Sequence, residues 1–203
     1  MCLSAIAGWL VYTRLLSAPV QPAASWPPKV AGSKVFFVPI GSFPDDQLDA
    51  LVRFYHQSYK LDIAVLKNLS LDESAHDSSR QQYVAEKLCD SLRSSFPEFS
   101  DNPSQILIGF TTEDIYPLTN NWRFAFGWRK TGTGTAVVST ARMSLPYRGE
   151  GLSFNVPETR LRKMVTKDIG ILYYGLPQNT NPKSVLYNQI LGIEELDAVS
   201  EEF

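Results

Sequence analysis

"TKDIGILYYGLPQNTNPKSVLYNQILG", residues 166–192, is the stretch from which the fold and the site are best approached. It begins like an amphipathic helix, stops at Gly175-Leu176-Pro177, and continues through an Asn-Pro loop into a second apolar run. This succession of helix, glycine stop and loop is typical of a metal-binding active-site segment, yet the stretch contains neither histidine nor cysteine. It is therefore an active site of another kind, the frame of a former one, or neither.

The helix that enters this stretch is predicted over residues 156–175. Pro157 suits a first-turn position, where its missing N–H costs nothing, and Gly175 suits a C-terminal stop. The apolar stripe of this helix contains Leu161, Met164, Val165, Asp168, Ile169 and Leu172. Asp168 is the polar member, and a buried carboxylate needs a partner or a route to water. The pattern favours the simpler interpretation, in which Asp168 lies at the solvated edge of the stripe; a functional site is the alternative.

The chain before this helix alternates strands and helices. Apolar β-rich runs predict strands, and apolar residues at helical spacing predict amphipathic helices. The expected strands cover residues 34–41, 61–68, 104–116, 122–129 and 135–143, and the expected helices cover 43–60 and 79–96. This β-α-β-α-β order predicts an α/β fold, with a mixed β-sheet packed against helices in a single compact domain. The last two strands are expected to form a hairpin on that sheet.

Residues 1–33 differ in composition from the rest of the chain. About a dozen mostly apolar residues precede Arg14, and an Ala/Pro-rich linker follows. The length of the apolar run fits a signal peptide or, less well, a membrane anchor. We therefore expect a folded domain over 34–203 and a protein that is exported or associated with a membrane through its N-terminus. A helix packed on the domain, or a mis-assigned start, is the alternative and would leave the protein cytoplasmic.

Composition narrows the function classes. The chain has 203 residues, of which 44% are hydrophobic and 20% charged, and this excludes a disordered chain. The net charge is -2 and no basic cluster stands out, so nucleic acid is not expected as a partner. The two histidines, His56 and His76, both lie in the first half. A site that needs three imidazoles cannot be built from this chain.

Several segments, taken in order, resemble the archaemetzincins, zinc-dependent peptidases of the metzincin clan. The resemblance runs from about Lys34 onward. It is carried by Pro39-Ile40-Gly41 after the first strand, Arg80-x-Gln82-Tyr83, "GFTTEDIYP" (109–117), "FAFGWRKTGTGTAVVSTARM" (124–143) and "NPKSVLYNQILGIEELD" (181–197). The resemblance implies a metzincin-like mixed sheet packed against helices, with a cleft next to the sheet.

This sequence departs from the family at the metal motif. A metzincin uses His-Glu-x-x-His-x-x-Gly-x-x-His, in which the histidines bind zinc and the glutamate acts as general base. Aligning the glycine places the residues of this chain as follows: Asp168 and Ile169 on His-Glu, Leu172 on the second histidine, Gly175 on the glycine and Gln178 on the third histidine. A register shifted by one puts Lys167 and Asp168 on His-Glu and Ile171 on the second histidine. Neither register supplies a zinc site.

The other metal features of the family are also replaced. The family carries cysteines just after the third histidine and a few residues on, where this chain has Asn179 and Ser184. The methionine beneath a metzincin's zinc corresponds to Leu186, an apolar exchange that preserves packing without sulfur. We therefore expect no zinc and no other cofactor.

These observations predict a metzincin-fold pseudo-peptidase that binds a peptide or protein partner of unknown identity. In the metzincin clan a strand next to the cleft pairs with extended substrate, and the segment 135–143 is similar to that strand. The residues expected to form this binding edge are Ala136, Val137, Val138, Ser139, Thr140, Ala141 and Arg142. Two alternatives remain open: an enzyme using other chemistry in the same cleft, with Lys167 and Asp168 among its polar groups, or a structural domain tethered to a membrane.

Overall fold

The computed structural model describes residues 34–145 and 156–203. The predicted N-terminal segment 1–33 lies outside these residues. Within the described part of the chain, no helix is long and apolar enough to cross a membrane.

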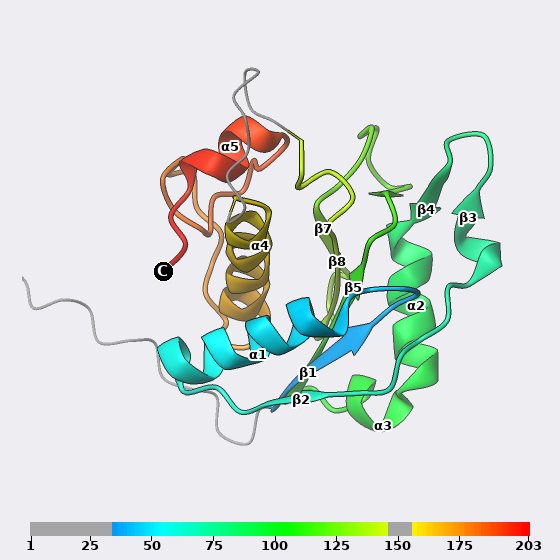
Figure 1. Cartoon of the computed structure of the whole chain (residues 1–203), viewed down its shortest axis with the longest axis horizontal. Helices are drawn as coiled ribbons and strands as arrows, with labels where there is room; N and C mark the ends of the chain where they lie inside the picture. Colours follow the sequence, from blue (N-terminus) through cyan, green and yellow to red (C-terminus); the bar gives the residue numbers. More distant parts are fainter. Residues whose placement is uncertain (1–33, 146–155) are drawn as a thin grey trace, which may run out of the picture.

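The described elements follow the predicted alternation of strands and helices (Figure 1). In the first half these are β1 (Lys34–Pro39), α1 (Asp45–Tyr59), β2 (Ile63–Val65), η1 (Glu73–Ala75), β3 (His76–Asp77), β4 (Gln82–Val84), α2 (Ala85–Ser95) and α3 (Pro97–Ser100). In the second half they are β5 (Gln105–Thr111), β6 (Ile115–Tyr116), β7 (Gly127–Arg129), β8 (Thr135–Ser139), α4 (Val156–Leu172) and α5 (Ile193–Ala198).

The helix predicted from residue 79 begins later than its sequence indicated. Gln82–Val84 forms strand β4, which pairs with β6 in a small second sheet of order β3-β4-β6, and α2 starts only at Ala85. Gln81 has a positive φ of 54°, which breaks any helix at that point. The predicted helix start at residue 79 is therefore wrong, because residues 79–81 form a turn and residues 82–84 are used for strand pairing.

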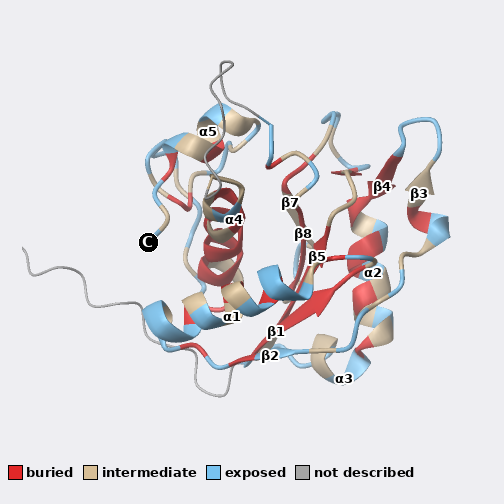
Figure 2. Cartoon of the chain, in the orientation of Figure 1, coloured by how far each residue is buried: buried red, intermediate tan, exposed pale blue. Residues whose placement is uncertain are grey.

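The main sheet is mixed, as predicted. Its order is β2-β1-β5-β8-β7. The first four strands run parallel to their neighbours, whereas β7 pairs antiparallel with β8 through a hairpin. The strands β1, β5 and β8 are almost wholly buried, as expected for parallel strands that are covered on both faces (Figure 2).

The expected binding edge over residues 136–142 is not an edge. Residues 136–139 belong to β8, which is paired on one side with β5 and on the other with β7. Residues 140–142 follow the strand, and the Thr140 N–H donates to the carbonyl of Thr111. Within the described part of the chain, β7 is the outermost strand on this side of the sheet, and its outer edge is unpaired. The prediction failed because hydrophobic periodicity predicts strands but not their order in the sheet.

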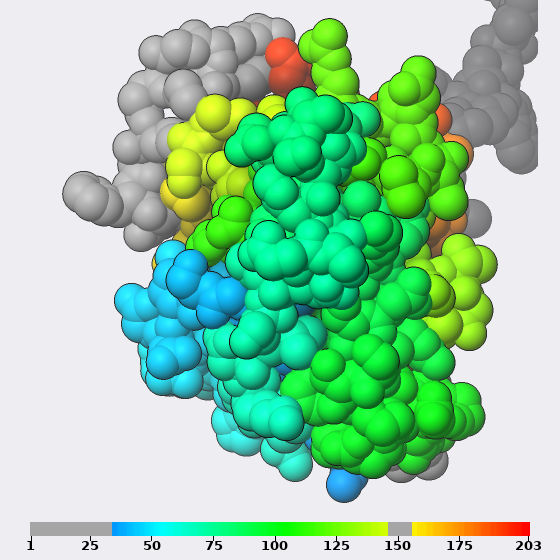
Figure 3. Space-filling view, turned by 90° about the vertical axis from the view of Figure 1, so that its right-hand side faces the viewer, coloured from blue at the N-terminus to red at the C-terminus, as the bar shows by residue number. Residues whose placement is uncertain are grey.

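Helices cover both faces of the main sheet. On one face α1 and α4 pack against alternate strand residues such as Val35, Phe37 and Ile108. On the other face α2 packs against the residues in between, such as Phe36, Val38 and Leu107. Figure 1 shows α1 and α4 on one side of the strands and α2 on the other. Figure 3 shows the α2 side, where the teal-to-green segments form the outer surface.

Candidate functional site

The end of α4 is built as predicted for a helix with a glycine stop. The helix ends at Leu172, the Tyr173 N–H donates to the Ile169 carbonyl at 2.9 Å, and the Leu176 N–H donates to the Gly170 carbonyl at 2.9 Å. Gly175 follows with a φ of +67°, in the left-handed region that glycine tolerates best. The chain then turns back along α4 toward its C-terminal segment.

Asp168 lies in the protein interior. It is 0% exposed, and its Oδ1 accepts a hydrogen bond from Nη1 of Arg129 at 2.5 Å. Its second oxygen, Oδ2, is buried and has no hydrogen-bond partner among the described residues. The expectation of a solvated edge is therefore wrong: Asp168 is fully buried, and the Arg129 side chain from β7 reaches it. Sequence analysis missed Arg129, although the need of a buried carboxylate for a cation was a signal for it.

The remaining motif positions do not gather around one point. Ile169 is fully buried in the core formed with α1 and the sheet. Leu172 and Gln178 instead line a shallow hollow of about 400 Å³ beside β7 and its hairpin turn. Positions 167, 168 and 171 of the shifted register all lie on the side of α4 that faces β7. Lys167 lines a second pocket, described below, and Ile171 lines the hollow. Both registers therefore place their first two histidine positions on the side of α4 that faces β7: residues 168 and 172 in the first register, and residues 167 and 171 in the shifted one.

Lys167 is a buried base next to the ion pair. It is 4% exposed, and its Nζ donates a hydrogen bond to the carbonyl of Tyr187. The pKa of Lys167 is lowered to about 8, chiefly by burial and also by the nearby Arg129 guanidinium, while the charge of Asp168 acts in the opposite direction. Burial raises the pKa of Asp168, and Arg129 opposes that shift through its charge and its hydrogen bond.

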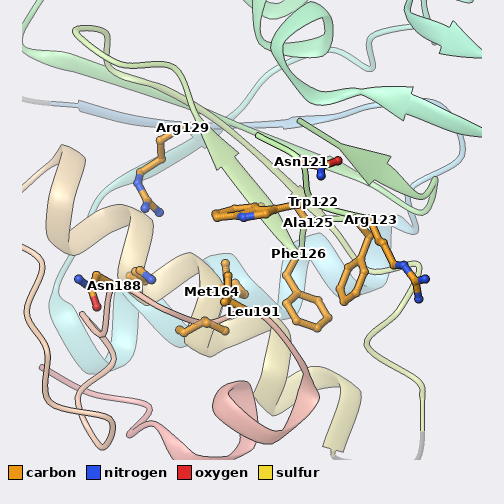
Figure 4. A pocket seen from close by; sticks show the side chains of 13 residues that line it. Asn121, Trp122, Arg123, Ala125, Phe126, Arg129, Met164, Asn188 and Leu191 are labelled. Carbon is orange, nitrogen blue, oxygen red and sulfur yellow. The ribbon is translucent and has the colours of Figure 1, made fainter. Parts of the chain in front are cut away.

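A pocket of about 320 Å³ opens between β7 and α4. Gly127 and Arg129 border it from the strand, Met164 and Lys167 from the helix. Residues 121–126 form one wall, and residues 188, 190 and 191, from the segment before α5, form another. Figure 4 shows Arg129 and Trp122 above Met164, with Phe126 and Leu191 below them and Asn188 to the left. The pocket thus combines an apolar interior with basic side chains.

A polar network holds the wall formed by residues 121–126. Gln82 Nε2 donates to Asp114 Oδ2 at 2.8 Å and to the Arg123 carbonyl at 2.9 Å. Arg80 donates to the carbonyls of residues 122 and 123, and Arg142 donates to both oxygens of Asp114. Three of the segments that carry the resemblance to the family, at 80–83, 109–117 and 124–143, therefore meet here. They position a wall of the pocket.

Hydrogen bonds close the loop over residues 179–186. Asn179 Nδ2 donates to Ser184 Oγ at 3.0 Å, at the two positions where the family carries cysteines. The Asn179 N–H also donates to the Leu186 carbonyl at 3.0 Å. Leu186 is buried, and its Cδ2 would lie 3.0 Å from a Cβ placed on Gly170 of α4. Hydrogen bonds at residues 179 and 184 and the apolar packing of Leu186 thus hold this loop against α4.

The residues around the pocket do not fit a zinc ion. Within residues 34–145 and 156–203, no group of three or more His, Cys, Asp or Glu side chains could hold a metal. Asp168, the one carboxylate at the motif, already binds a guanidinium, and the ammonium of Lys167 lies beside it. Two nearby cations oppose the approach of a third.

No protein-family model matches the chain. An archaemetzincin of Haloquadratum walsbyi is 32% identical over 156 residues, which cover 75% of this chain and 84% of the relative.

Two solved structures share the fold. The archaemetzincin of Methanopyrus kandleri matches with a TM-score of 0.66 and 23% identity, over 84% of this chain and 89% of that one. A zinc-dependent peptidase of Methanocorpusculum labreanum matches with a TM-score of 0.66 and 19% identity, over 83% of this chain and 95% of that one.

Proposed function

The chain belongs to the archaemetzincin family, and from this membership we propose that it binds an extended peptide segment without zinc-dependent hydrolysis. The observation that carries the proposal is the Arg129–Asp168 ion pair. In either register Asp168 stands where the family's motif has a zinc ligand or the general base. Here its Oδ1 binds a guanidinium, and the residue is fully buried.

Zinc is the cofactor that the family's metal motif implies, and we propose that this chain does not bind it in the pocket. The second histidine position is held by Leu172 or, in the shifted register, by Ile171, and a hydrocarbon offers no lone pair to a cation. The adjacent guanidinium and ammonium add electrostatic repulsion. No step of any reaction is therefore assigned to a metal.

The free edge of β7 supports peptide binding. The Phe126 carbonyl accepts a hydrogen bond from the Ser139 N–H, and the Lys130 N–H donates to the Thr135 carbonyl. The bonded backbone groups of Phe126 and Lys130 therefore face β8. By the alternation of an antiparallel ladder, the N–H and C=O groups of Gly127 and Arg129 point the other way. Both residues border the pocket and the neighbouring hollow. An added strand needs only such unpaired backbone groups.

The experiment has a metal arm and a peptide arm. Protein purified without chelator is analysed for zinc by mass spectrometry and assayed against a broad peptide library for cleavage. The same library is screened for binding by fluorescence polarisation. Bound peptides are then remade with N-methyl groups at alternate residues. One methylation frame is expected to abolish binding, because it removes the N–H groups that face β7, and the other is expected to leave binding intact.

Three results would refute the proposal. Stoichiometric zinc together with peptide cleavage would return the chain to the catalytic members of the family. Failure of every peptide to bind would remove the peptide-binding function. Equal loss of affinity in both methylation frames would show that binding does not use strand addition.

A proton-transfer enzyme in the same pocket is the second candidate. It is favoured by one observation: Lys167 lines the pocket and has a pKa lowered to about 8, which suits a general base better than an ordinary lysine. Asp168 cannot share this role while it is buried against Arg129. Any turnover found in a substrate screen should then be lost in Lys167→Gln. Turnover that persists in that variant would eliminate this candidate.

We also propose that residues 1–33 target the protein for export or tether it to a membrane, and the sequence of that segment supports this. Fractionation of cells producing the native chain separates the outcomes. Recovery with membranes indicates a tether, as expected if the protein is a structural domain held at a membrane. Recovery in an exported soluble fraction indicates a cleaved signal peptide. Recovery in the cytoplasm would refute the proposal.

A further inference from the structure

The pocket between β7 and α4 carries an excess of positive charge. Arg123, Arg129 and Lys167 line it, and its described lining residues include no carboxylate. Asp168 neutralises one of these three charges from beneath, through its bond to Arg129. A net positive, partly apolar pocket favours an anionic group that is joined to an apolar one.

Two of these cations have unused hydrogen-bonding capacity. An ammonium has three N–H donors and a guanidinium has five. Among the described residues, the side chain of Lys167 donates to the Tyr187 carbonyl and that of Arg129 donates to Asp168 Oδ1. Lys167 is buried, so its remaining donors lack full access to bulk water. A carboxylate in the pocket would accept from both side chains.

The strand next to these cations is too short to pair with a long peptide. β7 contains only Gly127–Arg129, and at Lys130 the chain enters the hairpin turn, where the Thr133 N–H donates to the Lys130 carbonyl. Arg129 therefore offers outward backbone groups and a cationic side chain from one residue. A backbone that pairs here meets the positive charge within one or two residues. This suits the end of a peptide chain better than its middle.

We propose that the pocket takes the C-terminal residue of an extended peptide, with its free carboxylate between Lys167 and Arg129 and its apolar side chain against Phe126, Met164 and Leu191. This inference rests on the proposed peptide binding and specifies which part of the peptide is recognised. The apolar groups line the same pocket as the cations, and Figure 4 shows Phe126, Met164 and Leu191 beneath Arg129 and Trp122. At pH 7 the ammonium of Lys167 is charged, because the pKa of Lys167 remains at about 8.

The test varies the chemistry at the end of the ligand. Short acetylated peptides ending in Leu, Phe or Met are synthesised with a free C-terminal acid and again as C-terminal amides. A third set is amidated and carries a glutamate at the last or the penultimate position. Affinities are measured by fluorescence polarisation with the full chain at pH 7. Free acids are expected to bind at least about tenfold more tightly than amides, the loss typical of one charged hydrogen-bonded contact.

Two variants with the same change of charge accompany the peptides. Lys167→Met removes a proposed partner of the carboxylate and should reduce the preference for acid over amide to about threefold or less. Lys130→Gln removes a neighbouring positive charge that binds Asp90 and does not line this pocket, so the preference should remain. If Lys167→Met does not fold, the comparison of acid and amide with the unmodified protein still decides the question.

Each outcome has a defined meaning. Equal binding of acids and amides, with the N-methylation pattern intact, would overturn the C-terminal recognition and leave the proposed peptide binding standing. Amidated glutamate peptides that bind as tightly as free acids would also overturn it, because a side-chain carboxylate would then be the anion. Binding of no peptide at all would remove the proposed function itself.

Discussion

Among the described residues, the buried carboxylate of Asp168 has one oxygen bonded to Arg129 and one without a hydrogen-bond partner. The stability of this region therefore depends strongly on Arg129. A buried carboxylate that loses its cation must be protonated or remain as an unpaired charge, and either change is costly. The loss of the partner costs Arg129 less, because its side chain is 22% exposed whereas that of Asp168 is 0% exposed. The guanidinium can turn toward water when its partner is removed.

The first prediction uses this asymmetry. Arg129→Met should lower the free energy of unfolding by about 3 kcal/mol, since it strands Asp168, whereas Asp168→Leu should cost clearly less. The double variant Arg129→Met/Asp168→Leu should be more stable than Arg129→Met alone, because two apolar side chains replace the buried pair. Urea unfolding of the four proteins measures this cycle. Additive single losses would show that the two residues do not interact in solution.

The second prediction concerns Lys167 and pH. The pKa of Lys167 is about 8 in the folded protein and 10.5 for an ordinary lysine. Between these values the unfolded chain binds more protons, so the free energy of unfolding rises with pH through this window and levels off above it. Below about pH 8 the lysine is protonated in both states, and the cost of burying its charge is present in full.

In Lys167→Met this rise should be absent. The difference between variant and wild type should change by about 2.5 kcal/mol between pH 8 and pH 10.5. This is most of the full effect of about 3.5 kcal/mol, because the two pKa values differ by about 2.5 and each pKa unit is worth about 1.4 kcal/mol. Urea unfolding at a series of pH values measures it, and subtraction of the two curves removes the titration of other groups. Parallel curves would mean that Lys167 titrates as an exposed lysine does.

At the scale of elements, the wall of the pocket depends on residues that lie outside it. Gln82 and Asp114 come from β4 and the turn before β6, and they bind the carbonyl of Arg123 and the side chain of Arg142. Gln82 is buried, so each of its bonds replaces one to water that it cannot make. The second small sheet thus serves to hold residues 121–126 against the main sheet.

The third prediction tests this support. Gln82→Leu should destabilise the protein by about 2 kcal/mol, raise hydrogen exchange in residues 121–127 and weaken peptide binding, because it removes bonds that fix the wall. Arg93→Gln is the matched control, since Arg93 makes a similar bond to Ser100 between α2 and α3. It should affect stability alone. If both variants weaken binding equally, the network has no particular role at the pocket.

The fourth prediction concerns the turn after α4. A Cβ on Gly175 would meet nothing within 4 Å, and its φ is +67°. Gly175→Ala should therefore cost about 1 kcal/mol through backbone strain alone. Gly132→Ala, also in open space with a φ of +73°, is the control and should cost a similar amount. Thermal unfolding measures both, and a loss at Gly175 several times larger would reveal a packing role.

At the scale of the whole molecule, stability should not depend on zinc. An ion that binds the folded state stabilises it by about 2.7 kcal/mol at a hundred times its dissociation constant. The fifth prediction is that neither chelator nor added zinc moves the thermal midpoint of this protein. A double variant, Lys167→His/Ile171→His, places two imidazoles one turn apart on the β7 side of α4 and should gain a zinc-dependent increase. A zinc-dependent increase in the unmodified protein would contradict the proposed loss of the metal site.

Much of the architecture was readable from local pattern. The spacing of apolar residues predicted strands near β1, β2, β5, β7 and β8 and the helices near α1, α2 and α4, because each element must bury one face or both. The order of short motifs identified the family, which the 32% identity to an archaemetzincin confirms. The absence of histidine and cysteine between residues 166 and 192 was also decided by sequence alone.

The tertiary structure determined which distant residues and strands are in contact. The partner of Asp168 lies 39 positions away along the chain, and nothing in a helical stripe indicates which strand will cover it. Strand order placed β7 outside β8 and so moved the free edge away from residues 136–142. Local periodicity records only whether a side chain is buried. Pairing between distant segments depends on which arrangement of the whole sheet and its helices buries the most apolar surface while bonding every buried polar group, and that is settled only when the chain is folded.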